Sequence, residues 1–66
     1  MTAVMRFSWN AREKAYTANH GQHSYAVRPV PGGGWNLYVD GIARQGAATH
    51  KPLLRAAQDI ARATGA

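Results

Sequence analysis

The chain has 66 residues, no cysteine, and 8 basic against 3 acidic side chains, which gives a formal net charge of +5. We expect a chain of this length to form a single domain, residues 1–66, and such a domain buries only about 60% of the surface that its unfolded chain exposes. Without cysteine, neither disulfides nor thiolate metal sites can add to the small core. We therefore expect stability to come from packing or from self-association, with a homodimer as one possible form.

Hydropathy excludes a membrane-spanning class, because the apolar runs are only a few residues long. The first residues lack the apolar core of a secretory signal, so we expect a cytoplasmic protein without membrane contact, in which residues 1–3 are disordered. The excess of positive charge favours encounter with polyanions or acidic protein surfaces. It is equally typical of a small protein kept soluble by its charge.

The first predicted element is a strand, in which Met5, Phe7 and Trp9 alternate with side chains facing the other way. Two interpretations remain open for residues 10–18. Asn10 with Glu13 three residues later fits a capping box that opens a short helix. Residues 14–18 can also form a strand that pairs with the next one across a four-residue turn at 19–22, with Ala18 facing His23.

Residues 24–45 are typical of antiparallel β-structure. A loop at residues 30–34 would place apolar partners opposite each other, in the pairs Pro29 with Trp35, Val27 with Leu37, and Tyr25 with Val39. Asp40-Gly41 is a strong type I′ hairpin signal and sets Val39 against Ile42. The glycines at 32–34 join two strands rather than a strand and a helix, so they predict a flexible hairpin tip and not a phosphate-binding loop.

A helix is predicted after Gly46, with Thr49 or Lys51 as its cap, Pro52 in its first turn and Gly65 after its end near Thr64. Its inner stripe would contain Leu53, Ala56 or Ala57, Ile60, and Ala63 or Thr64. Arg55, Gln58, Asp59 and Arg62 would lie outside the stripe, with Arg55 and Asp59 as a surface pair.

The predicted fold is α+β: a three- to five-stranded antiparallel meander with one C-terminal helix packed on one face. This arrangement would bury the larger apolar side chains between the two layers. They are Phe7, Trp9, Tyr16, Tyr25, Val27, Trp35, Leu37, Val39, Ile42, Leu53 and Ile60.

A family resemblance is carried by Phe7-Ser-Trp9, Tyr25-Ala-Val-Arg28, Gly34-Trp-Asn-Leu-Tyr-Val-Asp-Gly41, and Thr49 ahead of an alanine-rich helix. The chain resembles short uncharacterised proteins of actinobacteria and their bacteriophages. More distantly, it resembles the DNA-binding modules of three strands and a helix at the N-termini of phage integrases. The second resemblance implies a DNA-reading sheet face with Arg28, Asn36, Tyr38 and Gln45, although the face predicted here also carries Ala15, Ala26 and Ala43.

The sheet face that the helix leaves open is the main candidate surface, with Thr17, Ser24, Ala26, Arg28, Asn36, Tyr38 and Gln45. Tyrosine and arginine anchor many protein interfaces, and the same side chains can contact bases and phosphates. A second, basic group could form from Arg44, Lys51 and Arg55. The predicted partner-binding residues are therefore Arg28, Asn36, Tyr38, Arg44, Gln45, Lys51 and Arg55.

Little in the sequence points to a metal, a cofactor or catalysis. His20 and His23, with His50 as a third ligand, could be considered for zinc, but exposed turn histidines explain their spacing better. Asp40 is needed for the Asp40-Gly41 turn, and Glu13 and Asp59 lie in separate elements. The sequence therefore indicates no pair of catalytic carboxylates. We expect neither enzymatic activity, nor a cofactor, nor a small-molecule substrate.

The sequence predicts a non-enzymatic binding module, an adaptor or inhibitor of phage or actinobacterial origin that contacts a host protein through its sheet face or a strand edge. The alternative is a small nucleic-acid-binding protein. That alternative would use Arg28, Tyr38, Arg44, Lys51 and Arg55. The arginines are dispersed over several elements, which favours a protein partner.

Overall fold

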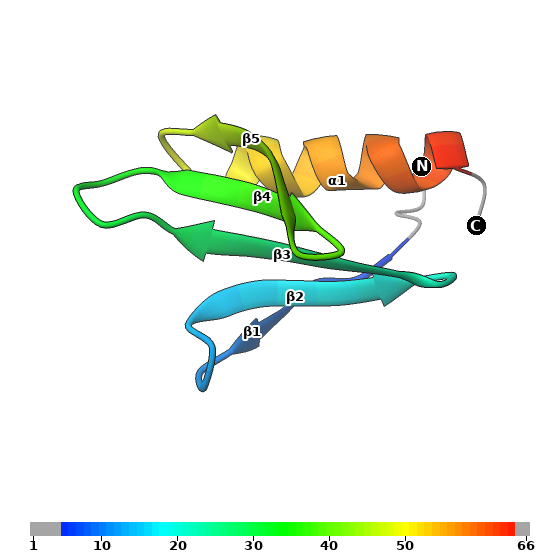
Figure 1. Cartoon of the computed structure of the whole chain (residues 1–66), viewed down its shortest axis with the longest axis horizontal. Coiled ribbons are helices and arrows are strands. Elements are labelled where there is room, and N and C mark those ends of the chain that lie inside the picture. Colours follow the sequence, from blue (N-terminus) through cyan, green and yellow to red (C-terminus); the bar gives the residue numbers. More distant parts are fainter. Residues whose placement is uncertain (1–4, 65–66) are drawn as a thin grey trace.

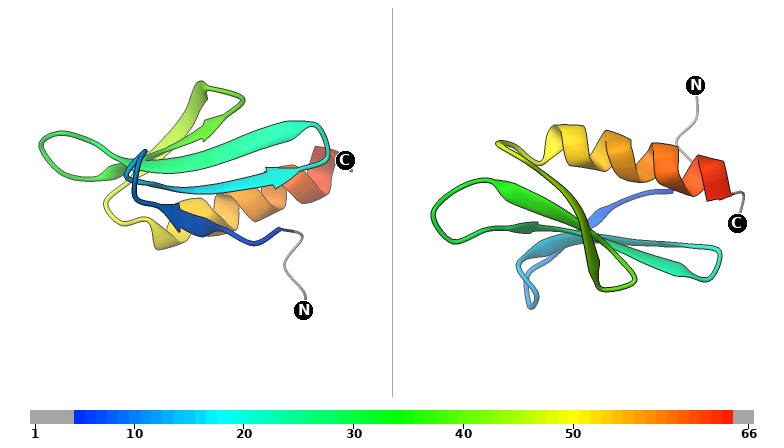
Figure 2. Two further views of the ribbon diagram at one scale, coloured as in Figure 1. Left: turned by 90° about the horizontal axis from the view of Figure 1, so that it is seen from below. Right: turned by 45° about the horizontal axis from the view of Figure 1, so that its top comes forward.

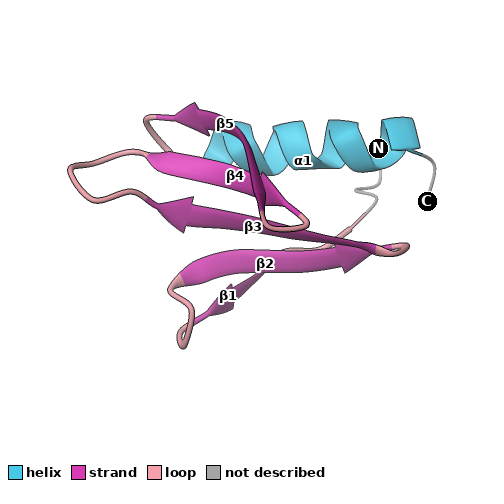
Figure 3. Cartoon of the chain, in the orientation of Figure 1, coloured by secondary structure: helices cyan, strands magenta, loops and turns pink. Residues whose placement is uncertain are grey.

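The computed structural model describes residues 5–64, which form five strands followed by one helix (Figure 1). The elements are β1 (Ser8–Asn10), β2 (Ala15–His20), β3 (His23–Pro29), β4 (Trp35–Val39), β5 (Ile42–Ala47) and α1 (Lys51–Thr64). The strands lie in sequence order and every neighbouring pair is antiparallel. The predicted α+β meander with one helix on one face is confirmed (Figure 3). The expectations for residues 1–3 and for Gly65 fall outside the described residues.

Because neighbouring strands run in opposite directions, the turns and loops that connect them lie at two opposite ends of the sheet. The β1–β2 turn, the β3–β4 loop and the segment before α1 lie at one end, on the left of Figure 1. The β2–β3 and β4–β5 turns lie at the other end. We call the first the helix-start end, because α1 begins there and runs back along the sheet. Among the described residues, no helix is long and apolar enough to cross a membrane.

The core lies between α1 and strands β3, β4 and β5. Its largest fully buried side chains are Tyr25, Val27, Leu37 and Leu53. On the helix, Leu53 is followed by Ala57 and Ala61, both fully buried, and these small side chains let the helix backbone approach the sheet. Ala61, which was not predicted, belongs to the stripe, whereas the predicted alternative Ala63 is exposed.

The helix ends are held by contacts that differ from those expected. The His50 carbonyl accepts hydrogen bonds from the N–H groups of Leu53 and Leu54, each at 3.0 Å, so His50 is the N-cap residue in place of Thr49 or Lys51. Asp59 pairs with Arg62 at 3.4 Å and not with Arg55.

Gln58, predicted to lie outside the inner stripe, is part-buried and ties α1 to the segment before β1. Its Nε2 donates to the Met5 carbonyl at 2.7 Å, and its Oε1 accepts from the Met5 N–H at 3.1 Å. The first strand is accordingly shorter than predicted. Met5 belongs to the core beside the helix, and strand pairing begins only at Ser8.

Residues 15–20 form a strand, which settles the choice left open by the sequence. Asn10 Oδ1 accepts a hydrogen bond from the Glu13 N–H at 3.1 Å, the same kind of bond that a helix cap would make. No helix follows, because Lys14 adopts a φ of 53° and turns the chain back into β2.

The predicted register between β2 and β3 is wrong by two residues. A tight turn at Gly21 and Gln22 pairs His20 with His23 and places Ala18, instead of Tyr16, opposite Tyr25. The tight turn shifts the ladder by two residues of β2 and sets a small side chain, Ala18, against a large one, Tyr25. Because side chains alternate with a period of two, this slip leaves every residue on its predicted face. The β3–β4 register and the Val39–Ile42 pair are confirmed.

Two side chains expected in the core are largely exposed: Trp9, with 49% of its surface accessible, and Ile42, with 65%. Both lie on edge strands. Trp9 is on β1, whereas α1 packs mainly over β3, β4 and β5. Ile42 begins β5 directly after the β4–β5 turn, and this turn points away from α1 in Figure 2. Phe7, Tyr16, Trp35 and Ile60 are only partly buried.

Candidate binding surfaces

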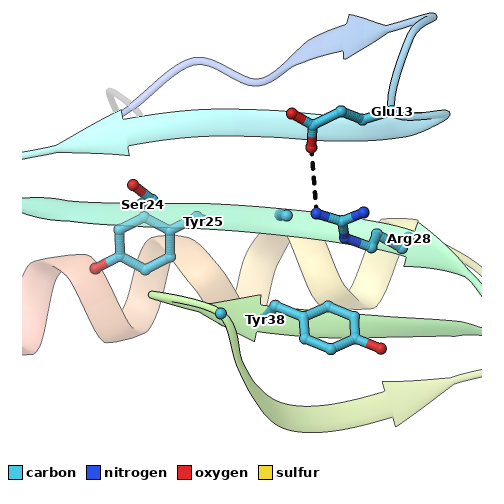
Figure 4. A pocket seen from close by; sticks show the side chains of 7 residues that line it. Glu13, Ser24, Tyr25, Arg28 and Tyr38 are labelled. Atoms are coloured by element: carbon cyan, nitrogen blue, oxygen red, sulfur yellow. Dashed lines mark hydrogen bonds and ion pairs between the residues drawn. The ribbon is translucent and has the colours of Figure 1, made fainter.

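The open face, which is the face of the sheet turned away from α1, carries an arginine held between a carboxylate and a ring (Figure 4). Arg28 Nη2 donates to Glu13 Oε1 at 3.2 Å, and its guanidinium carbon lies 5.7 Å from the centre of the Tyr38 ring. Glu13 reaches the arginine from the β1–β2 turn. Exposed ion pairs of this kind add only about 0–1 kcal/mol. Their effect here is to limit the positions that the guanidinium can adopt.

A hollow of about 430 Å³ surrounds this group. It is lined by Glu13, Ser24, Tyr25, Ala26, Arg28, Tyr38 and Gly41. The surface beside Tyr38 is hollowed because the residues paired with Tyr38 on the two neighbouring strands, Ala26 and Ala43, have small side chains. Ala15, also expected on this face, is fully buried next to the β1–β2 turn and is not available to a partner.

A β-bulge in β5 changes the expected membership of the open face. Leu37 pairs with Gln45, but the next residue, Tyr38, pairs with Ala43, so Arg44 is an extra residue in β5. One extra residue reverses the facing of every side chain beyond it. Gln45 therefore lies opposite the core residue Leu37, on the helix side, and its predicted place on the open face is wrong.

Asn36 keeps its predicted place on the open face, opposite Gly46. Its side chain bends over that glycine, since a Cβ atom at position 46 would lie only 2.7 Å from Asn36 Oδ1. The amide of Asn36 thus occupies the space that a larger residue in β5 would need. This arrangement leaves Asn36 half-buried beside Trp35 and not extended into the solvent.

The remaining predicted binding residues lie elsewhere. Lys51 and Arg55 line a separate hollow of about 450 Å³, together with Thr49 and Pro52, at the start of α1. This hollow shares no residue with the one on the open face. Arg44 stands at the bulge and lines neither. The structure thus separates Arg28, Asn36 and Tyr38 from the basic residues of the helix.

A row of aromatic rings, which the sequence did not predict as a site, crosses the helix-start end on the helix side. Tyr16 is its centre: Trp9 meets Tyr16 edge-on at 5.0 Å, and His50 stacks on Tyr16 at 4.8 Å with only 21° between the planes. Trp35 lies 5.9 Å from Tyr16 and 5.1 Å from His50. We call Trp9, Tyr16, Trp35 and His50 the aromatic row. The position of His50 just before the helix was the signal that could have linked it to rings at the same end.

His23 and Asp40 are joined by a structural contact. His23 Nδ1 lies 2.7 Å from Asp40 Oδ2, and this bond, followed by one from the Ser24 N–H, holds the pKa of Asp40 below its ordinary value. His50 is half-buried in the aromatic row, where it stacks on Tyr16. Within residues 5–64, no group of three or more His, Cys, Asp and Glu side chains could hold a metal ion.

Comparisons of the chain with protein-family models, with curated proteins and with solved structures found no match. The function is therefore inferred from the chemistry of the two surfaces described above.

Proposed function

We propose that this protein is a non-enzymatic binding module that docks a partner protein on its open face, with Tyr38 and Arg28 as the anchor. The observation that carries the proposal is the placement of Arg28 between Glu13 and the Tyr38 ring, beside a hollow. Tyrosine and arginine are enriched among the few residues that dominate protein interfaces. An anchor held in position before binding loses less side-chain entropy when the partner arrives.

The charge of the open face favours a protein over a nucleic acid as its partner. Glu13 offsets the charge of Arg28, while Thr17, Asn36 and Tyr38 are neutral. Binding to a phosphate backbone requires cations whose charge is free to replace counterions. We infer a partner surface of low charge that inserts an apolar side chain beside Ala26 and accepts hydrogen bonds at its rim.

The face is a better docking surface than the strand edges. β1 has only three residues. The edge of β5 is interrupted by the bulge at Arg44, and bulges and charged residues both hinder the addition of a further strand. The proposed role is that of an adaptor or inhibitor acting on a host protein, which rests on the resemblance to small bacteriophage proteins.

The proposal is tested by affinity capture from a nuclease-treated lysate of the native cells, followed by calorimetry with the purified captured protein. Tyr38→Ala should weaken binding by about 30-fold or more, the effect of losing a contact of about 2 kcal/mol at an interface centre. The matched control is Ile42→Ala, because Ile42 is an exposed apolar residue at the edge and should not affect binding.

Both variants should keep the wild-type circular dichroism spectrum, since neither removes a fully buried side chain. Binding that survives in a folded Tyr38→Ala variant would exclude the open face as the docking surface. Binding that is lost in Ile42→Ala but kept in Tyr38→Ala would place the partner at the β5 edge.

A further inference from the structure

We propose that the aromatic row, with the basic side chains on either side of it, is a binding site for single-stranded nucleic acid. This function goes beyond docking of a protein, and it uses the helix side of the sheet, where none of the open-face residues takes part. Two independent observations lead to it. The first is an exposed ring at the end of the aromatic row, and the second is that basic residues lie near the row whereas the acidic residues pair elsewhere.

The exposed ring is that of Trp9, which keeps 49% of its surface accessible. Leaving so much of a large aromatic side chain in water forgoes the stabilisation that burial would provide. Tyr16 holds the indole edge-on at 5.0 Å, and Tyr16 in turn stacks on His50. The row therefore presents a positioned aromatic surface at its β1 end, against which an unpaired base can stack.

Basic residues lie in the two chain segments that adjoin the row. The β1–β2 turn, which joins the strands of Trp9 and Tyr16, contains Arg12 and Lys14, and the helix that follows His50 begins with Lys51 and carries Arg55. The turn and the helix start lie at the same end of the sheet in Figures 1 and 2. All four of these basic residues are exposed.

The acidic residues are directed away from this surface. Glu13 is bound by Arg28 on the open face, Asp40 lies in the turn at the far end, and Asp59 pairs with Arg62 in the second half of α1. Within residues 5–64, no salt bridge joins a carboxylate to Arg12, Lys14, Lys51 or Arg55. Their charge is therefore available to phosphates.

The combination of rings and cations is specific for a single strand. Proteins that bind single strands use a basic surface that follows the backbone and aromatic side chains on which bases stack. The bases of a duplex are already stacked on one another and offer no open face to Trp9. The hollow formed by Thr49, Lys51, Pro52 and Arg55, next in sequence to His50, provides room for the sugar–phosphate chain beyond the row.

The first test is fluorescence anisotropy with a labelled oligothymidylate of about 12 nucleotides. With four phosphates neutralised, affinity should fall roughly 50-fold between about 50 and 200 mM salt. Lys51→Ala combined with Arg55→Ala should weaken binding and reduce the salt dependence by about half. The matched control, Arg44→Ala combined with Arg62→Ala, removes the same charge from β5 and the end of α1 and should have a much smaller effect.

Trp9→Ala tests the stacking. It should weaken oligothymidylate binding roughly 5- to 150-fold, while Trp9→Phe, which keeps a ring, should restore much of the loss. Inorganic polyphosphate of similar length should compete poorly, and a duplex of the same length should bind more weakly than the single strand. Circular dichroism confirms that each variant is folded.

The proposal is overturned by any of three results. They are no binding of oligothymidylate at low salt, equal binding by folded wild-type and Trp9→Ala proteins, and equal competition by polyphosphate. Tyr38→Ala separates the two surfaces, because it should weaken protein docking by about 30-fold or more and leave oligothymidylate binding unchanged. Loss of oligothymidylate binding in Tyr38→Ala would place the nucleic acid on the open face and refute the site at the aromatic row.

Discussion

The imidazole Nδ1 of His23 lies 2.7 Å from Asp40 Oδ2, so a single carboxylate joins the start of β3 to the β4–β5 turn. The other carboxylate oxygen, Oδ1, accepts a hydrogen bond from the Ser24 N–H at 2.8 Å, and the Asp40 N–H donates to the Ser24 carbonyl at 2.8 Å. Asp40 also has a φ of 54°, as the first position of a type I′ turn requires. One residue thus forms the turn and ties it to the neighbouring hairpin.

The hydrogen bonds to Asp40 predict an acid-dependent stability. They lower its pKa in the folded protein below the ordinary value of 3.8. A carboxyl with a lowered pKa contributes stability above its unfolded pKa, and this contribution is lost as the pH falls through the folded value. Asp40→Asn keeps an acceptor for Ser24 and suits the turn, but it cannot titrate.

The melting temperature of the wild type, relative to that of Asp40→Asn, should therefore decrease as the pH is lowered from about 6 to below 3.8. Thermal unfolding followed by circular dichroism across this range measures the difference. A difference that stays constant with pH would show that the Asp40 carboxylate makes no net contribution to stability.

Leu53 is expected to be a principal stabilising residue of the two-layer core. It is fully buried between α1 and the sheet, and truncation of such a residue destabilises by about 2–5 kcal/mol. Leu53→Ala should therefore populate the unfolded state strongly in so small a domain. Urea denaturation gives the comparison with Ile42→Ala, which removes an exposed side chain and should change the free energy of unfolding by less than about 0.5 kcal/mol.

Tyr25 combines a buried ring with an unpaired hydroxyl. The residue is only 1% exposed, and its hydroxyl has no hydrogen-bond partner among the described residues. A buried polar group without a partner is unfavourable by about 1–3 kcal/mol. Tyr25→Phe should consequently be as stable as the wild type or more stable by about 1 kcal/mol, as measured by urea denaturation. A clear destabilisation would reveal a partner for the hydroxyl.

Glycine is required at position 46 because the Asn36 side chain occupies the space that a Cβ atom there would need. A Cβ atom there would lie 2.7 Å from Asn36 Oδ1 and 3.3 Å from the Trp35 carbonyl oxygen. Gly46→Ala should destabilise by about 1 kcal/mol, since the Asn36 side chain must move. In a double-mutant cycle, Asn36→Ala should recover most of this loss. Independent, additive effects of the two substitutions would contradict the contact.

Several features followed from the sequence because they depend on residues close together in the chain. Turn chemistry at Asp40-Gly41 predicted the Val39–Ile42 pair, and the alternation of apolar residues on both sides of residues 30–34 predicted the register of β3 with β4. The same alternation placed Arg28, Asn36 and Tyr38 on the open face. The spacing of Leu53, Ala56 or Ala57, and Ile60 predicted the helix and the side that it turns to the sheet.

Other features depend on how the layers meet. The helix packs mainly on β3, β4 and β5, which leaves Trp9 exposed and brings His50 against Tyr16. The bulge at Arg44 moves Gln45 to the helix side, and no turn residue signals it. The contact between Glu13 and Arg28 joins residues from separate hairpins.

Local pattern thus determined β3, β4, β5 and the helix, and the face that most of their residues occupy, because period and turn chemistry act over a few residues. The tertiary structure decided which of those faces remain open and which side chains converge on them. That outcome depends on the area that a 14-residue helix can cover on a five-stranded sheet. Trp9, which the helix leaves exposed, and the rings that converge beside it form the surface that the sequence did not reveal.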